Sequence, residues 1–243
     1  MSTYANGDIH GNLGALDSLL AQIEPELDAE DTVVLLGDYI DRGLNSKDCI
    51  ERILRLRAEA PCPIVGLLGN HEQWMLRTMN DPRSHSWVLA TEALETVRSY
   101  SEEAAVKIAD AMGALRIRLF TEKAPLPYGE FFEAMPEEHI TFFRELKPYY
   151  RTPDVICVHG GMSLDGILDP SDDNVHVWGP LGFPEDYVGK DPVVYGHRDD
   201  GIVDADGVAR PCVGVNRTYG IDTIARGVLT CLRFPDEKVW QGG

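Results

Sequence analysis

The sequence predicts an α/β fold in which buried strands and helices alternate along the chain. Five short apolar runs each end in glycine beside a polar residue, a pattern typical of buried strands: TYANGDIHG, TVVLLGDYIDRG, PIVGLLGNHE, DVICVHGG and DPVVYGH. Helical patterns separate the first three runs. This alternation favours parallel βαβ units, whose functional groups gather at the carboxyl ends of the strands.

The two segments between the first three runs carry the periodicity of amphipathic helices. Leucines recur at helical spacing in residues 12–27, and residues 46–60 repeat the pattern through Ile50, Ile53 and Leu56. Ser46 stands at the start of the second segment, where a hydroxyl is suited to cap a helix. Each helix is therefore expected to pack one face against the sheet.

From about residue 79 to residue 150 the alternation stops. Three helices are predicted there, in WVLATEALETVRSY, EEAAVKIADAMGALRIRL and PEEHITFFREL, with a loop at EKAPLPYGE. Because inserted helices most economically form a cap or flank, residues 79–150 are predicted to be a helical insertion in a single domain of residues 1–243. After His197, ARPCVGVN and GVLTCLRF are predicted to be strands that would suit a second sheet packed on the first.

The composition limits the class of protein. With 40 acidic and 22 basic residues the formal charge is -18, which repels nucleic acid. No run approaches the roughly 18 apolar residues of a membrane span, and the N-terminus has no signal-peptide pattern, so a soluble cytoplasmic protein is expected. The five cysteines are scattered without CxxC spacing, which predicts free thiols.

The strand ends carry side chains that bind divalent metals. Each residue type is ordinary in a turn when taken alone, but here they recur at one place in the repeat: Asp8 and His10, Asp38, Asn70, His159 and His197. Carboxylate, imidazole and amide ligands suit Mn, Fe or Zn, and the absence of thiols argues against a structural zinc site. The set exceeds what one ion with open positions takes, so two ions sharing a carboxylate are expected.

The motifs GDIHG, GDYIDRG, GNHE, HGG and YGH occur in this order. They closely resemble the signature blocks of the calcineurin-like metallophosphoesterases, and specifically of the phosphoprotein phosphatase branch with its bacterial and phage serine/threonine phosphatases. The resemblance is dense over residues 7–76, returns at 155–161 and 193–197, and extends to the closing YGIDTIARGVLTCLRF. It implies an αββα sandwich of two mixed sheets flanked by helices.

The resemblance also implies roles for individual residues. Two divalent metal ions are implied, Mn first and Fe or Zn as alternatives, with a hydroxide bridging them as the nucleophile. Asp8 and His10 would bind the first ion, Asp38 would bridge, and the second site would be completed by Asn70, His159 and His197. His71 and Asp41 would form the acid pair that protonates the leaving group. Arg42 would clamp the phosphate, and Asn70 would also contact the substrate.

Physical chemistry supports these roles. Two cations outweigh the two carboxylates among the ligands, so the site can attract a phosphate inside an acidic protein and lower the pKa of bound water. An imidazole beside a buried carboxylate holds a proton near neutral pH and releases it to a leaving group. The planar fork of Arg42 matches two phosphate oxygens.

The sequence departs from the family pattern at one phosphate contact. Many phosphoprotein phosphatases have an arginine just after the tryptophan between the fourth and fifth blocks, but here Trp178 lies in HVWGPLGFP. We hypothesise that Arg198, or else Arg217, makes the second phosphate contact. The alternative is that Arg198 is a solvated arginine near the acidic residues that follow it.

The motifs leave more than one function open. The first interpretation is a serine/threonine protein phosphatase that acts on a phosphorylated protein, or another small-phosphoester hydrolase. The alternative within the same chemistry is a dinucleoside polyphosphate hydrolase of the diadenosine tetraphosphatase kind. A catalytically inactive phospho-recognition module is the alternative from another class, and the presence of Asp41, His71 and all matched ligands argues against it.

Overall fold

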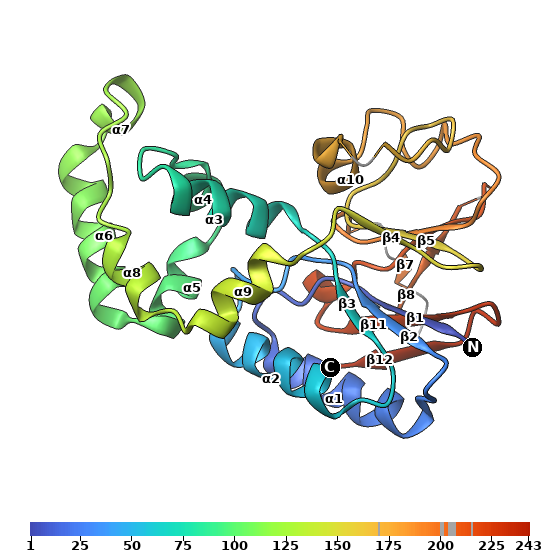
Figure 1. Cartoon of the computed structure of the whole chain (residues 1–243). Coiled ribbons are helices and arrows are strands. Elements are labelled where there is room, and N and C mark those ends of the chain that lie inside the picture. Colours follow the sequence, from blue (N-terminus) through green and yellow to red (C-terminus); the bar gives the residue numbers. More distant parts are fainter. Residues whose placement is uncertain (170, 200–201, 204–207, 215) are drawn as a thin grey trace.

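The computed structural model describes residues 1–169, 171–199, 202–203, 208–214 and 216–243, in which two five-stranded sheets pack against each other (Figure 1). The first sheet has the order β12-β11-β1-β2-β3. Its strands are β1 (Thr3–Asn6), β2 (Thr32–Leu35), β3 (Ile64–Gly66), β11 (Leu229–Phe234) and β12 (Val239–Gly242). The strands β1, β2 and β3 are parallel, whereas β11 is antiparallel to both of its neighbours.

The second sheet has the order β4-β5-β6-β10-β9. Its strands are β4 (Tyr149–Arg151), β5 (Ile156–Val158), β6 (Val193–Tyr195), β9 (Cys212–Val213) and β10 (Thr218–Gly220). Its three central strands are parallel, and β4 and β9 pair antiparallel at the two edges. A separate antiparallel pair is formed by β7 (Ile202–Val203) and β8 (Ala209–Arg210).

The strands predicted for the five apolar runs are confirmed, but they divide between the two sheets. The run ARPCVGVN, in which residue 215 lies outside the described residues, forms the two short strands β8 and β9 of different sheets rather than one strand. The first three runs form β1, β2 and β3, and the fourth and fifth form β5 and β6. The run GVLTCLRF forms β11 in the first sheet, beside β1, rather than a strand of the second sheet. The predicted metal ligands therefore follow strands of both sheets, and they meet at an edge that the two sheets share, which is called the rim below.

The helices α1 (Leu13–Ile23) and α2 (Ser46–Glu59) are the crossovers that the periodicity predicts. Their buried leucines and isoleucines join the apolar cluster on one side of the first sheet. The prediction that Ser46 caps α2 is wrong, because Ser46 is the first helical residue and is fully buried. Its hydroxyl accepts the backbone N–H of Asp41 at 3.3 Å and lies 3.1 Å from Thr96 Oγ1.

The helical insertion projects to one side of the sandwich (Figure 1). After α3 (Asn70–Asn80) it contains α4 (Ser86–Ala90), α5 (Ala93–Tyr100), α6 (Glu102–Leu115), α7 (Arg118–Thr121), α8 (Gly129–Ala134) and α9 (Glu137–Arg144). The single helix predicted for WVLATEALETVRSY is interrupted at residues 91–92, where the Thr91 hydroxyl donates to the carbonyl of Trp87 at 2.6 Å. Such a bond from a side chain back to the preceding turn competes with helix continuation.

Three apolar layers hold the fold together. One cluster lies between the sheets, a second joins α1, α2 and the insertion to the first sheet, and a third covers the other side of the second sheet. That last layer is mostly irregular chain and includes Met162 and Phe183. The remaining short elements are the helix α10 (Asp173–Trp178) and the 3-10 turns η1 (Glu24–Glu26) after α1 and η2 (Ile224–Arg226) after β10, whose Ile224 packs in the cluster on the first sheet. This arrangement confirms the predicted sandwich of two mixed sheets flanked by helices.

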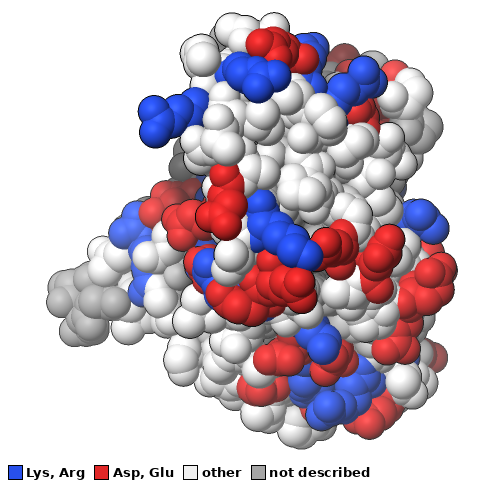
Figure 2. Space-filling model, turned by 90° about the vertical axis from the view of Figure 1, so that its left-hand side faces the viewer, with Lys and Arg blue, Asp and Glu red and all other residues white. Residues whose placement is uncertain are grey.

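The surface reflects the composition. On the face shown in Figure 2, acidic and basic side chains alternate without a continuous basic area. Among the helices of the described residues, none has the length and apolar character required to cross a bilayer.

Candidate active site

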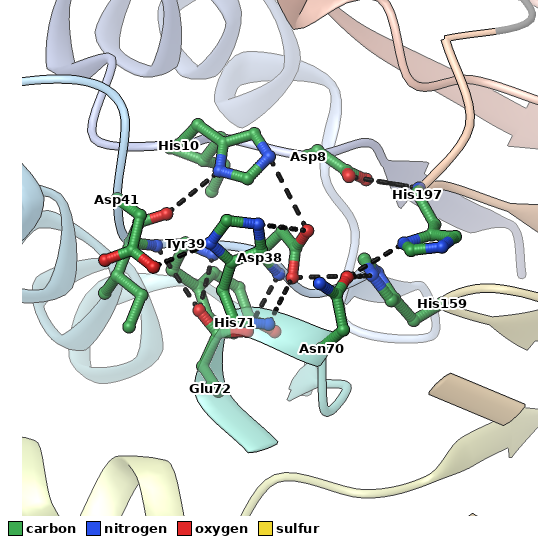
Figure 3. Close-up of polar contacts among 12 residues, drawn as sticks. Asp8, His10, Asp38, Tyr39, Asp41, Asn70, His71, Glu72, His159 and His197 are labelled. Carbon is green, nitrogen blue, oxygen red and sulfur yellow. Dashed lines mark hydrogen bonds and ion pairs between the residues drawn. The ribbon is translucent and has the colours of Figure 1, made fainter. Parts of the chain in front are cut away.

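The structure brings the predicted metal-ligating residues together at the shared rim of the sheets (Figure 3). Asp8 and His10 follow β1, Asp38 follows β2, and Asn70 begins the helix after β3. His159 and His197 arrive from β5 and β6 of the second sheet. His197 is partly exposed, whereas each of the other five residues is at most 5% exposed. The rim is therefore a dense group of ionisable residues rather than an ordinary set of turns.

The loops that carry these residues have unusual backbone conformations. The φ angle is positive at His10 (46°), Asp38 (50°), Asp41 (69°), Arg42 (65°) and His197 (64°). Non-glycine residues rarely adopt this region, at a cost of roughly 1–3 kcal/mol each, and such residues cluster at functional sites. The strain identifies these loops as places where side-chain position is held against local preference.

Glu72 stabilises the loop after β2, and the sequence reasoning did not single it out. Its buried carboxylate accepts the backbone N–H groups of Asp38 and Tyr39 at 2.9 Å and of Ile40 at 3.3 Å. Glu72 is the last residue of the GNHE block, so its place in that block was the available signal. Glu72 therefore holds the backbone at Asp38 in place through these hydrogen bonds.

Glycine allows the loops after β2 and β3 to approach each other closely. Gly37 has a φ of 112°, and a Cβ there would lie 2.8 Å from the Cα of Gly69. A Cβ on Gly69 would overlap the backbone and carboxylate of Asp38. Side chains at either position would push the loops apart, so both glycines serve the assembly of the site.

Two groups of side chains are arranged to hold a cation each. One consists of His10, Asp38 and His71, and the other of Asp38, His159 and His197, with the ligand atoms of each group within 4.8 Å of one another. Asp38 belongs to both groups, as expected for a bridging carboxylate. Asn70 joins the second group, because its Oδ1 lies 3.0 Å from His159 Nε2 and 2.8 Å from His197 Nδ1.

The protonation of two of the histidines, His10 and His197, fits metal binding. His10 Nδ1 lies 2.9 Å from the carbonyl of Ile40, so Nδ1 is the donor and Nε2 keeps a lone pair. His10 Nε2 is buried without a hydrogen-bond partner and lies 3.5 Å from Asp38 Oδ2. Burial lowers the pKa of His10, and of His197, to about 4. Both imidazoles are therefore neutral near pH 7, the form that binds metals.

Asp8 is placed differently from the other expected ligands. Both of its oxygens accept the backbone N–H of His197, at 3.1 and 3.0 Å, and it is outside the group formed by His10, Asp38 and His71. Its role as a ligand of the first ion stays a prediction. Burial, followed by the charges of Asp222 and Asp38, raises the pKa of Asp8.

Asp222 is a further buried carboxylate that the sequence reasoning missed. It is 3% exposed, and its Oδ1 has no hydrogen-bond partner among the described residues. Burial and then the charge of Asp38 raise its pKa to about 6. Asp8, Asp38 and Asp222 thus place three buried carboxyl groups near one another, which is costly unless cations compensate them. The sequence signal for Asp222 was its position in the closing IDT segment, which resembles the family.

His71 and Asp41 form the predicted pair. His71 Nδ1 lies 2.6 Å from Asp41 Oδ2, and both residues are buried. Burial alone lowers the pKa of His71, but the charge of Asp38 and the hydrogen bond to Asp41 raise it to about 9. At neutral pH this imidazole carries a proton, in contrast to His10 and His197. The site therefore contains two histidines with a lowered pKa, His10 and His197, beside two with a raised pKa, His71 and His159.

The arginines lie at the margin of the site. Arg42 is exposed and lines an open cavity of about 600 Å³ together with His71, Leu89, Ala90, Thr91 and Glu92. Arg198 is half-buried beside Gly179, where a Cβ would lie 3.3 Å from Arg198 Nη2, and its charge contributes to the low pKa of His197. Arg217 is exposed. Arg42 as a phosphate contact stays a prediction, and so does the choice between Arg198 and Arg217 as the second.

Binding of Mn²⁺ is expected to raise the Tm of the metal-free protein. A ligand present at about 100 times its Kd stabilises the folded state by about 2.7 kcal/mol, which corresponds to about 5–10 °C for a domain of this size. The measurement is calorimetry after EDTA treatment and dialysis, with Mn²⁺ and Zn²⁺ compared with Ca²⁺, which binds imidazole-rich sites poorly. Equal Tm values with all three ions and without metal would contradict a transition-metal site.

The substitution Arg198→Ala is expected to raise KM for a phosphate monoester by about tenfold or more, because a hydrogen bond to a charged group contributes about 1.5–3 kcal/mol. Metal content should not change. Steady-state kinetics on the variant and on Arg217→Ala provide the measurement. Unchanged kinetics for Arg198→Ala would reject Arg198 as the second phosphate contact. A raised KM in Arg217→Ala alone would assign that contact to Arg217.

Comparison with known proteins identifies the family of the chain. The model for calcineurin-like phosphoesterases matches residues 1–227. The symmetrical bis(5'-nucleosyl)-tetraphosphatase of Pectobacterium carotovorum is 40% identical over 78 residues, which are 31% of this chain and 25% of that protein. The zinc-dependent endopolyphosphatase of Saccharomyces cerevisiae is 28% identical over 114 residues, 45% of this chain and 34% of that protein. The matched part of the chain thus spans a quarter to a third of the length of these relatives.

Solved structures show the same fold at low sequence identity. A candidate diadenosine tetraphosphatase aligns with a TM-score of 0.59 and 18% identity, covering 99% of this chain and 92% of that chain. A metallophosphoesterase from Sphaerobacter thermophilus aligns with a TM-score of 0.54 and 17% identity, covering 100% of this chain and 87% of that chain. Because the family model matches nearly the whole sequence and the fold agrees, the chain belongs to the calcineurin-like phosphoesterase family.

Proposed function

We propose that the chain hydrolyses phosphate monoesters of alcohols with the help of two divalent metal ions, and that phosphoserine and phosphothreonine side chains are its first substrate class. The observation that carries this proposal is the pair of His71 and Asp41, joined at 2.6 Å beside the cavity that Arg42 lines. An alkoxide is a poor leaving group and needs a proton as it departs. A buried, protonated imidazole is suited to supply that proton.

Different residues of the site bind the phosphate and protonate the leaving group in the proposed reaction. When bound, two divalent ions would neutralise the phosphate charge and supply an activated water, with Mn²⁺ as the first candidate and Zn²⁺ or Fe²⁺ as alternatives. Arg42 binds phosphate oxygens from the rim of the cavity and orients the ester. Asp41 accepts from His71 Nδ1 and so directs Nε2–H toward the leaving oxygen. After transfer of that proton, the hydrogen bond to Asp41 favours reprotonation of His71.

A second candidate function is the symmetrical cleavage of dinucleoside tetraphosphates. It is favoured by the name of the Pectobacterium relative and by the fold shared with the candidate diadenosine tetraphosphatase. In that reaction the leaving group is a nucleoside diphosphate, which departs as an anion more easily than an alkoxide does. A strong general acid contributes less there, which is why the acid pair favours the phosphate monoester.

The test compares the two substrate classes directly. Metal-reconstituted protein is given a phosphothreonine peptide and diadenosine tetraphosphate in parallel, and the products are identified. The proposal expects metal-dependent phosphate release from the peptide at the higher kcat/KM. Preferential formation of ADP from the dinucleotide would replace it with the second candidate. An EDTA control and the variant Asp38→Asn, purified in the same way, exclude a contaminating phosphatase.

A further inference from the structure

The carboxylate of Asp41 has more partners than His71. Its Oδ2 also accepts the indole N–H of Trp87 at 2.8 Å, and its Oδ1 accepts the hydroxyl of Thr96 at 2.6 Å. The same hydroxyl accepts the backbone N–H of Asp41 at 2.8 Å. Asp41, Trp87 and Thr96 are each 0% exposed. Both carboxylate oxygens are thus held by fixed donors, and the carboxylate cannot rotate without losing at least one of these bonds.

Both additional donors come from the helical insertion. Trp87 lies in α4 and Thr96 in α5, whereas Asp41 lies in the loop after β2 and His71 is the second residue of α3. Trp87 also packs on Phe131 of α8, with ring centroids 5.5 Å apart, so its indole is anchored in the insertion itself. The contact therefore joins two parts of the chain that are separate in sequence.

The chain between these two donors lies against the cavity of the site. Residues 89–90 end α4 and residues 91–92 connect it to α5, and all four line the cavity beside His71 and Arg42. The interruption of the helix at Thr91 and Glu92 turns this connection toward the cavity while Trp87 and Thr96 remain on Asp41. The insertion consequently borders the side of the site to which His71 would deliver its proton.

We propose that Trp87 and Thr96 are positioning residues of the acid pair, through which the helical insertion sets the orientation of Asp41 and hence of His71 during leaving-group protonation. This inference rests on the proposed function, because it assigns a role to the same site. It differs from a purely structural role in a specific way: loss of either donor should slow reactions that need a proton more than reactions that do not.

The variants Trp87→Phe and Thr96→Val remove one donor each and keep most of the buried volume. With metal content and Tm measured alongside, kcat is compared for ethanolamine phosphate, an alkyl ester, and for p-nitrophenyl phosphate, whose leaving group needs no proton. We expect each variant to lose about tenfold more activity on the alkyl ester, which is the effect of about 1.4 kcal/mol in the transition state. Thr96→Ser keeps the hydroxyl and should restore the wild-type ratio.

Matched controls separate this effect from general loss of packing. Thr78→Val removes a buried hydroxyl of α3 that bonds the carbonyl of Ser84 at 2.9 Å, and Trp240→Phe changes a buried tryptophan of β12. Neither should change the ratio between the two substrates. Equal losses on both esters in Trp87→Phe and Thr96→Val would overturn the inference and leave these residues a structural role only.

A spectroscopic measurement tests the inference without turnover. The proton between His71 and Asp41 should give a downfield ¹H NMR signal, assigned by its loss in His71→Asn, and Trp87→Phe should shift it. An unchanged signal in both donor variants would reject the positioning role even if the enzyme is active. A signal that Trp87→Phe shifts relative to the wild type, in a protein whose wild-type form hydrolyses neither ester, would support the positioning role and reject the proposed function instead.

Discussion

Replacing Asp38 by Asn is expected to lower kcat/KM for a phosphate monoester by about a thousandfold or more and to remove most of the bound metal. Asp38 is the only residue shared by the two cation-binding groups of the described chain. Its Oδ2 lies 3.5 Å from His10 Nε2, and its Oδ1 lies 3.4 Å from His159 Nε2. Asn keeps the shape but removes the negative charge that faces both ions. Loss of several kcal/mol of transition-state stabilisation corresponds to that decrease in rate.

The measurement combines metal analysis, steady-state kinetics and the Mn²⁺-dependent rise of Tm. In the variant the rise of Tm should be strongly reduced, because two ions no longer share a ligand. Asp110→Asn is the matched control, since Asp110 is exposed on α6, away from the rim. A fully active variant that retains its metal would contradict the bridging role of Asp38.

The order of the motifs predicted which residues would meet, because each metal-type residue directly follows a strand. In parallel units the strand ends converge whatever the rest of the chain does. The division into two sheets was not predictable from the runs alone. It depends on β11 entering beside β1, a pairing between residues more than 200 positions apart. Such long-range pairings leave no periodicity in the local sequence.

The contacts of Trp87 and Thr96 with the acid pair could not be predicted from the sequence for the same reason. Trp87 is an ordinary buried tryptophan of a helical segment as far as its neighbours in sequence show. Only the packing of α4 and α5 against the loop after β2 brings its N–H to Asp41. Thr96 contacts Asp41 across 55 positions of sequence. Positions of this kind become functional through tertiary contacts that residue type and spacing do not encode.

Two buried histidines of the site have pKa values shifted in opposite directions, and the sequence motifs alone do not explain this difference. His10 and His71 are both buried and their rings lie 4.7 Å apart. His10 donates to a neutral carbonyl, and burial lowers its pKa to about 4. His71 faces Asp38 and donates to Asp41, and these carboxylates outweigh burial. The partner of Nδ1 and the nearby charges therefore decide in which direction the pKa of each of these two histidines moves.

The variant His71→Asn tests that assignment. It is expected to lower kcat for ethanolamine phosphate by about 10²–10⁴-fold, the usual contribution of general acid catalysis. For p-nitrophenyl phosphate the decrease should be much smaller, because that leaving group departs without a proton. The bound metal should be largely retained, since Asp38, Asn70, His159 and His197 remain in place.

The comparison of the two esters decides between two roles that the geometry gives to His71. Its Nε2 lies 3.7 Å from Asp38 Oδ2 and belongs to the first cation-binding group, so His71 is also placed as a ligand. A ligand that is lost lowers metal content and slows both esters alike, whereas a lost acid slows the alkyl ester selectively with metal still bound. His85→Asn, which alters a buried histidine bonded to the Ala124 carbonyl in the insertion, controls for packing. Selective slowing of the alkyl ester with metal retained would support the acid role, and equal slowing of both esters with metal lost would support the ligand role.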